Sequence, residues 1–401
     1  MGESLTVAYV YCHRFQAEGD RIRADQYFTQ QTWDRYLEYF GTVRLLSRVD
    51  ESGNNNADKS ESVIEGVSIC RLPDLYSPYH SFSRYMEIKK TLYAEISEVD
   101  GVVARLPCGI GQMAIHIAEK LEKPWAVEIV GCPWDAMWNY GSVLGKLYAP
   151  FATWTTKRVV KRAAHSLYVT SKFLQSRYPC KPGANTVACS NVEIPCPQDD
   201  TIDNRLDKIR TQSTPIVLGL IGSLDTRQKG IHVVIEALGK IRDRLPPVEF
   251  RILGGGSRSE WRRLAEKHHV DDIIYFDGTL PGGGPVFAWL DNIDVYLQPS
   301  LQEGLPRGLI EAMSRGCPAL GSDHAGIPEL LDPECLIEPG DSDGLAKLLL
   351  RVIEDDAWKE HQAWVNWKRS HEYTTRKLAL KRRLFWSRFI ADIEGRLHAG
   401  K

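Results

Sequence analysis

Two glutamates that lie eight residues apart are the first candidates for chemistry in this sequence. Glu303 lies in a polar loop after the short apolar run 295–297, and Glu311 lies in the helix predicted to follow. Eight residues span about two helical turns, so both carboxylates can face one cleft. The free N–H groups at the start of such a helix can bind phosphate or sugar oxygens. The pair therefore suits a neutral polyol such as a sugar, although two solvated surface acids are the common alternative for an isolated pair.

A second candidate site is the loop 222–230, which contains two cations. It follows a predicted strand at 215–221 and precedes a predicted helix at 231–242. Arg227 can present a planar fork to phosphate oxygens, and Lys229 can present a compact positive charge. A single loop of this kind is more often a solvated turn. Because the acid pair lies in the same half of the chain, we favour a phosphate-binding loop.

Length and composition limit the class of protein. The 401 residues suffice for two domains with separate cores, and 43% hydrophobic with 25% charged residues is typical of soluble globular proteins. A formal charge of -2 argues against nucleic acid as a partner. The nine cysteines include no CxxC pair, which indicates reduced thiols rather than a zinc site or disulfides. We find no signal peptide or membrane span and expect a cytoplasmic protein.

Strand and helix patterns alternate along both halves of the chain. Apolar runs typical of buried strands occur at 5–11, 43–46, 67–72, 101–105, 125–130 and 166–170, and again at 215–221, 249–253, 273–276, 295–297 and 319–322. Helical spacing of apolar residues fills most of the intervals. The alternation predicts an α/β protein with two doubly wound parallel sheets. We expect the ligand in the cleft between them, at the carboxyl ends of the strands.

We expect domain boundaries where this alternation is interrupted. Residues 1–193 would form the first domain and residues 194–374 the second, with the proline- and charge-rich stretch 194–214 as a linker. No strand follows the long helix predicted near the end of the sequence. We therefore expect residues 375–401 to cross back onto the first domain.

These motifs resemble those of the family 4 glycosyltransferases, whose GT-B fold places two Rossmann-like domains on either side of a cleft. The spacing of Glu303 and Glu311 matches the E-x7-E motif of the family, and the loop 222–230 matches its phosphate-binding loop. Weaker matches lie at 326–329 and 339–341. The stretch 105–135 is similar to the subgroup that makes capsular or other surface polysaccharides.

The resemblance implies a retaining transfer of a sugar from a UDP- or GDP-linked donor to a glycan or lipid-linked acceptor, with no metal or other cofactor. The first domain would bind the acceptor, and the second would bind the nucleotide sugar. Glu303 would hold the hydroxyls of the donor sugar, and Glu311 would hold those of the ribose. The backbone that assists Glu303 belongs to Gly304, Leu305 and Pro306.

The resemblance also assigns the phosphate and the base. Lys229 would neutralise the diphosphate beside Gly222 and Ser223. Many relatives carry an arginine at the position of Ser223, and here Arg227 is the nearby substitute for that second cation. The backbone that would contact the base belongs to Gly278, Thr279 and Leu280.

The first domain offers fewer clear candidates. No histidine follows the predicted strand 125–130, where many relatives have one that contacts the sugar. His13, Glu128 and Asp135 are the candidates to replace it. Arg105 ends a predicted strand that faces the cleft, and it either contacts the acceptor or forms a structural ion pair.

Two further segments allow two interpretations each. Asp341-Ser342-Asp343 has the DxD form of a metal motif, but an aspartate at this place favours a helix cap. The segment 134–165 carries aromatic and basic residues, which suits either the inner surface of a membrane or an ordinary helix with a solvated basic side. We favour the cap and the ordinary helix.

Two other classes of function remain compatible with the sequence. A metal-free epimerase or a phosphorylase can share the GT-B fold, although no lysine site for the pyridoxal phosphate of a phosphorylase is recognisable. A non-catalytic protein that binds nucleotide sugars would share the same donor site. Transfer to an acceptor separates these classes from a glycosyltransferase.

Overall fold

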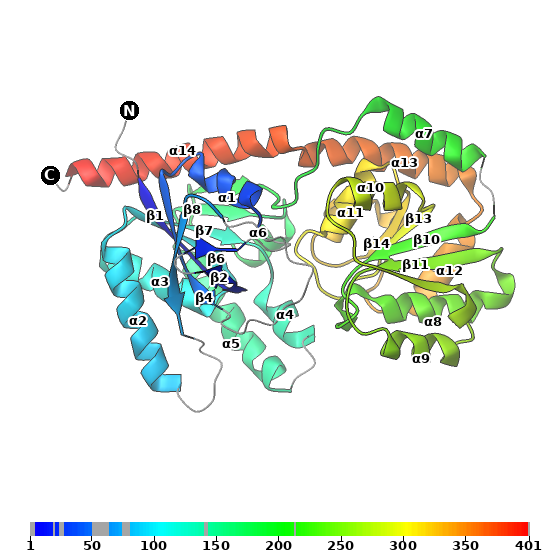
Figure 1. Ribbon diagram of the computed structural model, residues 1–401, viewed down its shortest axis with the longest axis horizontal. Coiled ribbons are helices and arrows are strands. Elements are labelled where there is room, and N and C mark those ends of the chain that lie inside the picture. Colours follow the sequence, from blue (N-terminus) through cyan, green and yellow to red (C-terminus); the bar gives the residue numbers. More distant parts are fainter. Residues whose placement is uncertain are drawn as a thin grey trace.

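The computed structural model describes residues 5–18, 21–23, 28–49, 64–73, 81–139, 143–211 and 214–399. Two lobes lie side by side, and each is built on a parallel sheet with helices on both faces (Figure 1). The sequence predicts this α/β architecture, and the structure confirms it.

The first lobe contains a seven-stranded sheet in the order β5-β4-β1-β6-β7-β8-β9. Its strands are β1 (Thr6–Phe15), β4 (Thr42–Val49), β5 (Val67–Leu72), β6 (Gly101–Leu106), β7 (Trp125–Ile129), β8 (His165–Tyr168) and β9 (Asn185–Ala188). A two-stranded ribbon joins β2 (Ala17–Glu18) and β3 (Arg21–Ile22). The helices are α1 (Gln30–Leu37), α2 (Ser81–Ser97), α3 (Gly109–Lys120), α4 (Pro133–Asn139), α5 (Val143–Val160) and α6 (Phe173–Arg177).

The second lobe contains a six-stranded sheet in the order β12-β11-β10-β13-β14-β15. Its strands are β10 (Ile216–Ile221), β11 (Val248–Leu253), β12 (Ile274–Gly278), β13 (Val295–Gln298), β14 (Ala319–Ser322) and β15 (Leu336–Ile337). The helices are α7 (Asp199–Arg210), α8 (Ile231–Ile241), α9 (Ser259–Lys267), α10 (Gly284–Asp291), α11 (Arg307–Ser314), α12 (Ser342–Val352) and α13 (Asp356–Ser370).

Both sheets reverse their strand order at the centre. In the first lobe the reversal lies between β1 and β6, and in the second it lies between β10 and β13. Loops at the carboxyl ends of the strands diverge at such a point and leave a crevice for ligands. The crevice of the first lobe therefore lies beside the end of β6, which Pro107 follows. The crevice of the second lobe lies beside the end of β13, which Pro299 follows.

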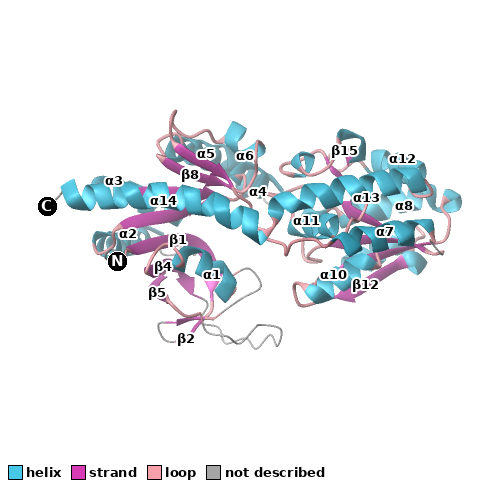
Figure 2. Cartoon of the chain, turned by 90° about the horizontal axis from the view of Figure 1, so that it is seen from above, coloured by secondary structure: helices cyan, strands magenta, loops and turns pink. Residues whose placement is uncertain are grey.

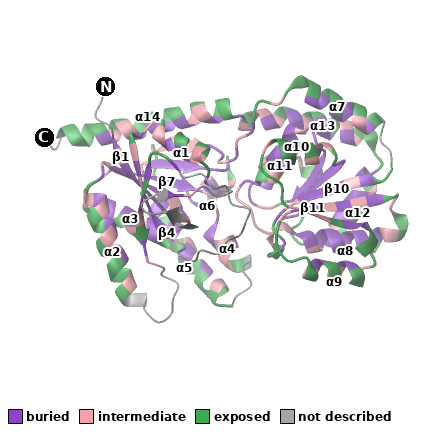
Figure 3. Ribbon diagram, in the orientation of Figure 1, coloured by how far each residue is buried: buried purple, intermediate pink, exposed green. Residues whose placement is uncertain are grey.

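The chain crosses between the lobes twice, at one place. Ile194 pairs with Thr374 in an isolated parallel bridge. The helix α14 (Thr375–Ala399) then runs along the first lobe (Figure 2). One face of α14 is buried in the core of that lobe (Figure 3), where Trp386 packs against Phe40 with ring centroids 5.4 Å apart.

The expected linker 194–214 is wrong in part, because most of it is the helix α7. Ile202, Leu206 and Ile209 recur at helical spacing and bury against α13, where they meet Ala363 and Trp367. The acidic start and basic end of α7 also suit the helix dipole. The sequence did not predict this helix because most residues of the segment are polar or charged.

Candidate active site

Lys229 and Glu303 meet where the crevice of the second lobe opens. Lys229 lies in a short 3-10 turn after β10, and Glu303 lies in the loop after the neighbouring strand β13. Lys229 Nζ is 2.6 Å from Glu303 Oε1, and the two side chains are 29% and 9% exposed. A charge-assisted contact this short and partly enclosed is stronger than a solvated surface pair. The structure therefore joins the two motifs predicted from the sequence.

Glycine at position 230 allows the two loops to approach so closely. Gly230 has a φ of +74°, and a Cβ added there would lie 2.0 Å from the carbonyl oxygen of Pro299. The backbone N–H of Leu301 donates to the carbonyl of Gln228 at 2.8 Å. Gly222 also lacks the Cβ that would lie 2.5 Å from Lys229 Cγ. The lysine stem therefore lies directly against the backbone of the phosphate loop.

A chain of hydrogen bonds orients the Glu303 carboxylate. Its Oε1 accepts from Gln298 Nε2 at 3.0 Å and from Ser300 Oγ at 2.9 Å, in addition to Lys229. Gln298 accepts in turn from the hydroxyl of Tyr296 at 3.0 Å. Among the described residues, no hydrogen bond reaches Glu303 Oε2. One oxygen is thus fixed by the protein, and the other is available to a ligand hydroxyl.

Glu311 is buried in α11, and its charge acts on the Tyr296 phenol. Burial raises the pKa of Glu311 to about 7, an effect that Arg307 partly opposes. The pKa of Tyr296 is raised well above its usual value by burial and then by the charges of Glu311 and Glu303. Gly308 leaves room for this phenol, because a Cβ there would lie 2.5 Å from the Tyr296 oxygen. The charges of both acids of the E-x7-E motif therefore act on the Tyr296 phenol.

The start of α11 has no side-chain cap. Pro306 is the N-cap residue, has an extended backbone, and its side chain accepts no hydrogen bond. The first N–H groups of the helix can therefore bind an anion. Gly304 lies against the first lobe, since a Cβ there would be 2.5 Å from the carbonyl oxygen of Val130, and Leu305 is buried behind it. The predicted donor loop is therefore also a contact between the lobes.

Arg227 is not brought to Lys229. Its guanidinium binds Glu260 at 2.6 Å, and its side chain is 60% exposed. Ser223 accepts a hydrogen bond from the N–H of Asp225 at 3.2 Å. The role of Arg227 as a second cation on the diphosphate remains a prediction, and this ion pair must break to fulfil it.

The loop predicted to contact the base adjoins the phosphate loop. A Cβ on Gly254 would lie 1.9 Å from the carbonyl oxygen of Gly222, and the N–H of Gly254 donates to Gly278 at 2.7 Å. Thr279 and Leu280 follow Gly278, and Leu280 is 40% exposed. The two loops therefore form one continuous edge of the second lobe.

On the first lobe, the Tyr9 hydroxyl connects Arg105 to Glu128, and the described residues show no direct ion pair between the two. Glu128 is 4% exposed and accepts from the hydroxyls of Tyr9 at 3.2 Å and Tyr36 at 2.7 Å. Arg105 donates to the same Tyr9 hydroxyl at 3.3 Å. Burial raises the pKa of Tyr9, so this hydroxyl stays protonated. The other candidate, His13, lies edge-on to Phe15 with ring centroids 4.8 Å apart.

Asp135 connects the first lobe to the second. Its carboxylate binds Arg177 Nη1 at 2.9 and 3.0 Å and lies 3.5 Å from Nε2 of His324 in the second lobe. Burial raises the pKa of Asp135, but the nearby His324 and the charge of Arg177 outweigh it, so the pKa is lowered. The sequence analysis missed His324, which has no motif signal of its own.

Glu329 forms a second connection that the sequence analysis did not assign. Its carboxylate accepts from the N–H groups of Ser171, Lys172 and Phe173 at 2.5, 2.9 and 2.8 Å. It thereby caps α6 of the opposite lobe. The match at 326–329 was noted in the sequence, but its residues gave no sign of a partner in the other half.

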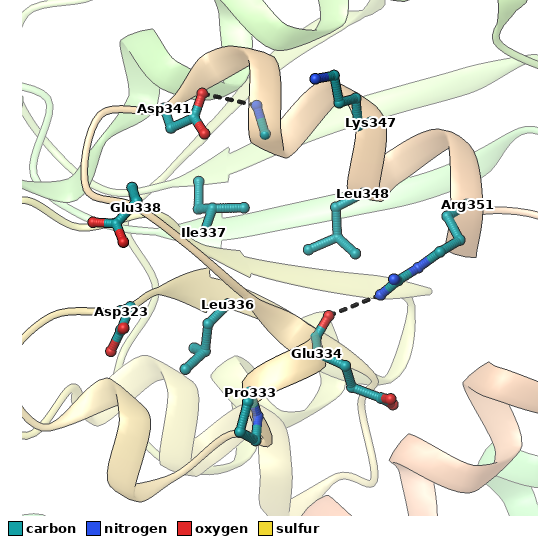
Figure 4. A pocket seen from close by; sticks show the side chains of 11 residues that line it. Asp323, Pro333, Glu334, Leu336, Ile337, Glu338, Asp341, Lys347, Leu348 and Arg351 are labelled. Atoms are coloured by element: carbon teal, nitrogen blue, oxygen red, sulfur yellow. Dashed lines mark hydrogen bonds between the residues drawn. The ribbon is translucent and has the colours of Figure 1, made fainter.

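The DxD-like sequence is a helix cap, as predicted. The N–H of Gly344 donates to Asp341 Oδ1 at 2.8 Å, and Asp343 pairs with Lys240 at 2.8 Å. Asp341 lines a cavity of about 550 Å³ at the outer edge of the second sheet, between β15 and α12 (Figure 4). This cavity contains none of the residues predicted to bind the donor.

Comparison with known proteins agrees with this geometry. The family described as Glycosyl transferases group 1 matches residues 215–355. Protein CapJ of Staphylococcus aureus is 31% identical over 356 residues, which cover 88% of this chain and 88% of CapJ. The putative colanic acid biosynthesis glycosyltransferase WcaL of Escherichia coli strain K12 is 34% identical over 158 residues, which cover 37% of this chain and 38% of WcaL.

The fold is shared with a solved structure over almost its whole length. Anabaena Alr3699/HepE in complex with UDP-glucose aligns with a TM-score of 0.66 at 13% identity, and the match covers 98% of this chain and 100% of that one. Such low identity supports the fold alone. Because the resemblance to CapJ spans both lobes and the group 1 domain spans the second, the chain belongs to the group 1 glycosyltransferases, family 4 with the GT-B fold, and is a glycosyltransferase.

Proposed function

We propose that the chain transfers a sugar from a UDP-sugar to a glycan or lipid-linked acceptor with retention of anomeric configuration; a GDP-sugar is the alternative donor. The observation that carries the proposal is the Lys229–Glu303 contact beside the uncapped start of α11. Glu303 Oε2 would accept from hydroxyls of the donor sugar, and Glu311 would accept from those of the ribose. Lys229 and the N–H groups of α11 would bind the diphosphate. The UDP-glucose bound to Alr3699/HepE supports this choice of base.

The proposed reaction needs no nucleophile from the protein. The bond between sugar C1 and the diphosphate oxygen breaks, and the acceptor oxygen bonds to C1 from the same face. The acceptor proton passes to the departing diphosphate. Because negative charge grows on the diphosphate, a fixed cation and oriented N–H groups stabilise the transition state more than the bound donor. We propose that Lys229 and α11 supply this stabilisation without a metal ion.

The biological setting we propose is the synthesis of a capsular or other surface polysaccharide. The name of WcaL refers to colanic acid biosynthesis, and its similarity to this chain supports that setting. The acceptor would then be a growing glycan or a lipid-linked precursor of one.

Glu303→Gln tests the transfer. The substitution keeps the size of the side chain and removes its charge, so we expect kcat to fall about 100-fold. The exposed Glu354→Gln is the matched control and should retain wild-type rates. Full activity of Glu303→Gln, or UDP-sugar binding without transfer across a broad acceptor panel, would refute the proposal. An inverted product by NMR would refute retention.

We also propose that α5 rests on an anionic membrane surface. We favoured an ordinary helix from the sequence, but the apolar stripe that α5 exposes supports the membrane alternative: Val143, Leu144, Leu147, Tyr148, Phe151 and Trp154 are each 51–78% exposed. Residues 136–192 include eight lysines and arginines and no acidic residue. Exposed apolar side chains flanked by cations suit the interface of an anionic bilayer. Within the described ranges, no helix has both the length and the apolarity to cross a bilayer.

Vesicle binding tests this contact. Vesicles with phosphatidylglycerol should sediment the wild-type protein, and vesicles of phosphatidylcholine alone should sediment much less of it. High salt should weaken the binding. A Leu147→Ser/Phe151→Ser double variant should lose it, whereas Leu384→Ser, which removes an exposed leucine from α14, should not. Equal sedimentation of wild type and the double variant would contradict the contact.

A further inference from the structure

A small pocket between the lobes is lined by guanidinium groups from four different elements. It has a volume of about 80 Å³. Arg35 comes from α1, Arg105 from β6, Arg307 from α11 and Arg382 from α14. Glu128 is the acidic residue in its lining. Arg307 belongs to the second lobe, so the pocket is complete only when the lobes face each other.

The carboxylates in and around this pocket do not balance its positive charge. Arg35 and Arg382 share the carboxylate of Glu193, which lies 3.1 Å from Arg35 Nε. Glu128 accepts hydrogen bonds from two tyrosine hydroxyls. It forms no direct ion pair with an arginine among the described residues. Four guanidinium groups thus face the carboxylates of Glu128 and Glu193, and Glu311, on which the charge of Arg307 acts, is a third carboxylate nearby. Arginine remains protonated in proteins, so this surplus persists at any physiological pH.

Arg105 and Arg307 carry the unmatched charge. Arg105 donates a hydrogen bond to the neutral Tyr9 hydroxyl, and its buried Nε has no partner within the described chain. The rings of Tyr11 and Phe28 lie 5.2 and 5.4 Å from the guanidinium and compensate its charge only in part. Arg307 is exposed and forms no hydrogen bond or ion pair with the described residues. The guanidinium of Arg105, whose Nε is buried and without a partner in the described chain, calls for an anion, and Arg307 adds a second positive charge at the edge of the pocket.

The size and place of the pocket indicate what that anion belongs to. A cavity holds one water molecule for about each 10–15 Å³ of such volume, so the pocket has room for a carboxylate or phosphate group. Arg307 lies four residues after Glu303, at the start of the helix proposed to bind the donor diphosphate. The other three arginines lie on the first lobe or on α14. A group held here would sit across the crevice from the donor.

We propose that this pocket binds a carboxylate or phosphate of the acceptor and so selects anionic acceptors. The proposal rests on the transferase function proposed above. Arg105 and Arg307 would each donate to the oxyanion, and a planar fork suits two oxygens of one carboxylate or phosphate. The acceptor class is therefore a glycan with a uronate residue or a glycosyl phosphate.

Paired acceptors test the proposal in the full-length protein. One pair is a glucuronoside and its methyl ester, and the other is a glycosyl phosphate and the corresponding neutral glycoside. We expect kcat/KM for at least one anionic member to exceed that of its neutral partner roughly 10- to 100-fold. Whichever pair shows the difference identifies the anion. Equal use of both members in both pairs would overturn the proposal.

Substitutions in the pocket test whether it causes the preference for anionic acceptors. Arg307→Gln leaves the core intact because Arg307 is exposed, and it should reduce the preference about tenfold, mainly through KM. Arg105→Lys keeps the charge without the fork and should reduce it less than Arg105→Met. Arg351→Gln removes an arginine from the cavity of Figure 4 and should leave the preference unchanged. Equal losses for charged and neutral acceptors in the Arg105 and Arg307 variants would contradict the assignment.

A binding measurement separates this inference from the transferase function. Methyl phosphate or glucuronate should raise the melting temperature of the wild-type protein more than glucose does, and this difference should vanish in Arg105→Met/Arg307→Gln. Anion binding without transfer to any acceptor would refute the proposed function and keep the pocket. Transfer with no effect of either anion or of the variants would refute the pocket and keep the function.

Discussion

The two sides of the crevice are built in different ways. On the second lobe, Lys229 and Glu303 lie in short loops after neighbouring strands, and glycines bring these loops together. On the first lobe, a buried network contains residues far apart in the chain, such as Tyr9 and Glu128, which are 119 positions apart. The proposed donor side therefore depends on backbone approach, and the proposed acceptor side depends on side chains from separate elements. Substitutions on the acceptor side can change specificity without rebuilding a loop.

Removing the cation Lys229 tests the proposed donor side and should have the largest effect on transfer. Lys229→Met keeps the aliphatic stem against Gly222 but removes the charge proposed to face the diphosphate, so we expect kcat to fall about 10²- to 10³-fold. The measurement is the initial rate at saturating donor. Lys240→Met is the control, because Lys240 pairs with Asp343 on α12 and should be tolerated. A loss below tenfold in Lys229→Met would mean that the N–H groups of α11 suffice.

Glu311 gives the donor side a pH dependence of stability. The folded protein retains the proton of Glu311 up to about pH 7, whereas an unfolded chain loses it near pH 4.5. Between these values the folded state binds more protons, so the free energy of unfolding falls as pH rises from about 4.5 to 7. The difference amounts to about 3 kcal/mol. Glu311→Gln should flatten this fall, and urea unfolding at pH 5 and pH 8 would detect the change.

The same carboxylate should make donor binding pH-dependent. Ribose hydroxyls donate to the ionised form, so the affinity for a UDP-sugar should rise about tenfold between pH 6 and pH 8. Glu311→Gln is the matched comparison and should bind weakly at both values. Titration calorimetry measures both proteins. Identical pH profiles would show that Glu311 does not contact the donor.

Glu329 connects the two sides, and its removal should have a smaller effect. Glu329→Gln weakens the charged cap of α6, so we expect a loss of about 1–2 kcal/mol in interlobe stability. Because the proposed transfer requires the lobes to hold both substrates between them, KM should rise severalfold while kcat changes little. Small-angle scattering should show a more open average shape. An unchanged shape and KM would contradict a role for this contact in closure.

The smallest effect is expected at Asp341, outside both sides. Asp341→Ala removes the cap of α12 and should lower the free energy of unfolding by about 1 kcal/mol. Transfer rates should stay at the wild-type value, and EDTA should not change them in either protein. Loss of activity with EDTA, restored by a divalent cation, would overturn the proposal of metal-free transfer.

The difference between the two sides also explains what could be predicted from the sequence. The acid pair and the phosphate loop follow fixed spacings, because local backbone geometry places them. The contact of Glu329 with α6 and the gathering of Arg105, Arg307 and Arg382 depend on how whole lobes meet, which no local spacing encodes. The helix α7 was missed because its buried stripe is thin within a polar composition. The pairing of Arg227 with Glu260 likewise depends on a neighbouring loop.

The return of α14 to the first lobe has a consequence for synthesis. Phe385, Trp386, Phe389 and Ile393 complete the same apolar cluster as Tyr9 and Trp33. During translation the first lobe therefore exposes part of its interior until residue 393 has left the ribosome. The second lobe, whose own cluster spans 192–353, can become compact earlier. Although it is made first, the amino-terminal half should be the last to reach its native state. Until then its exposed apolar surface would need to be shielded from aggregation.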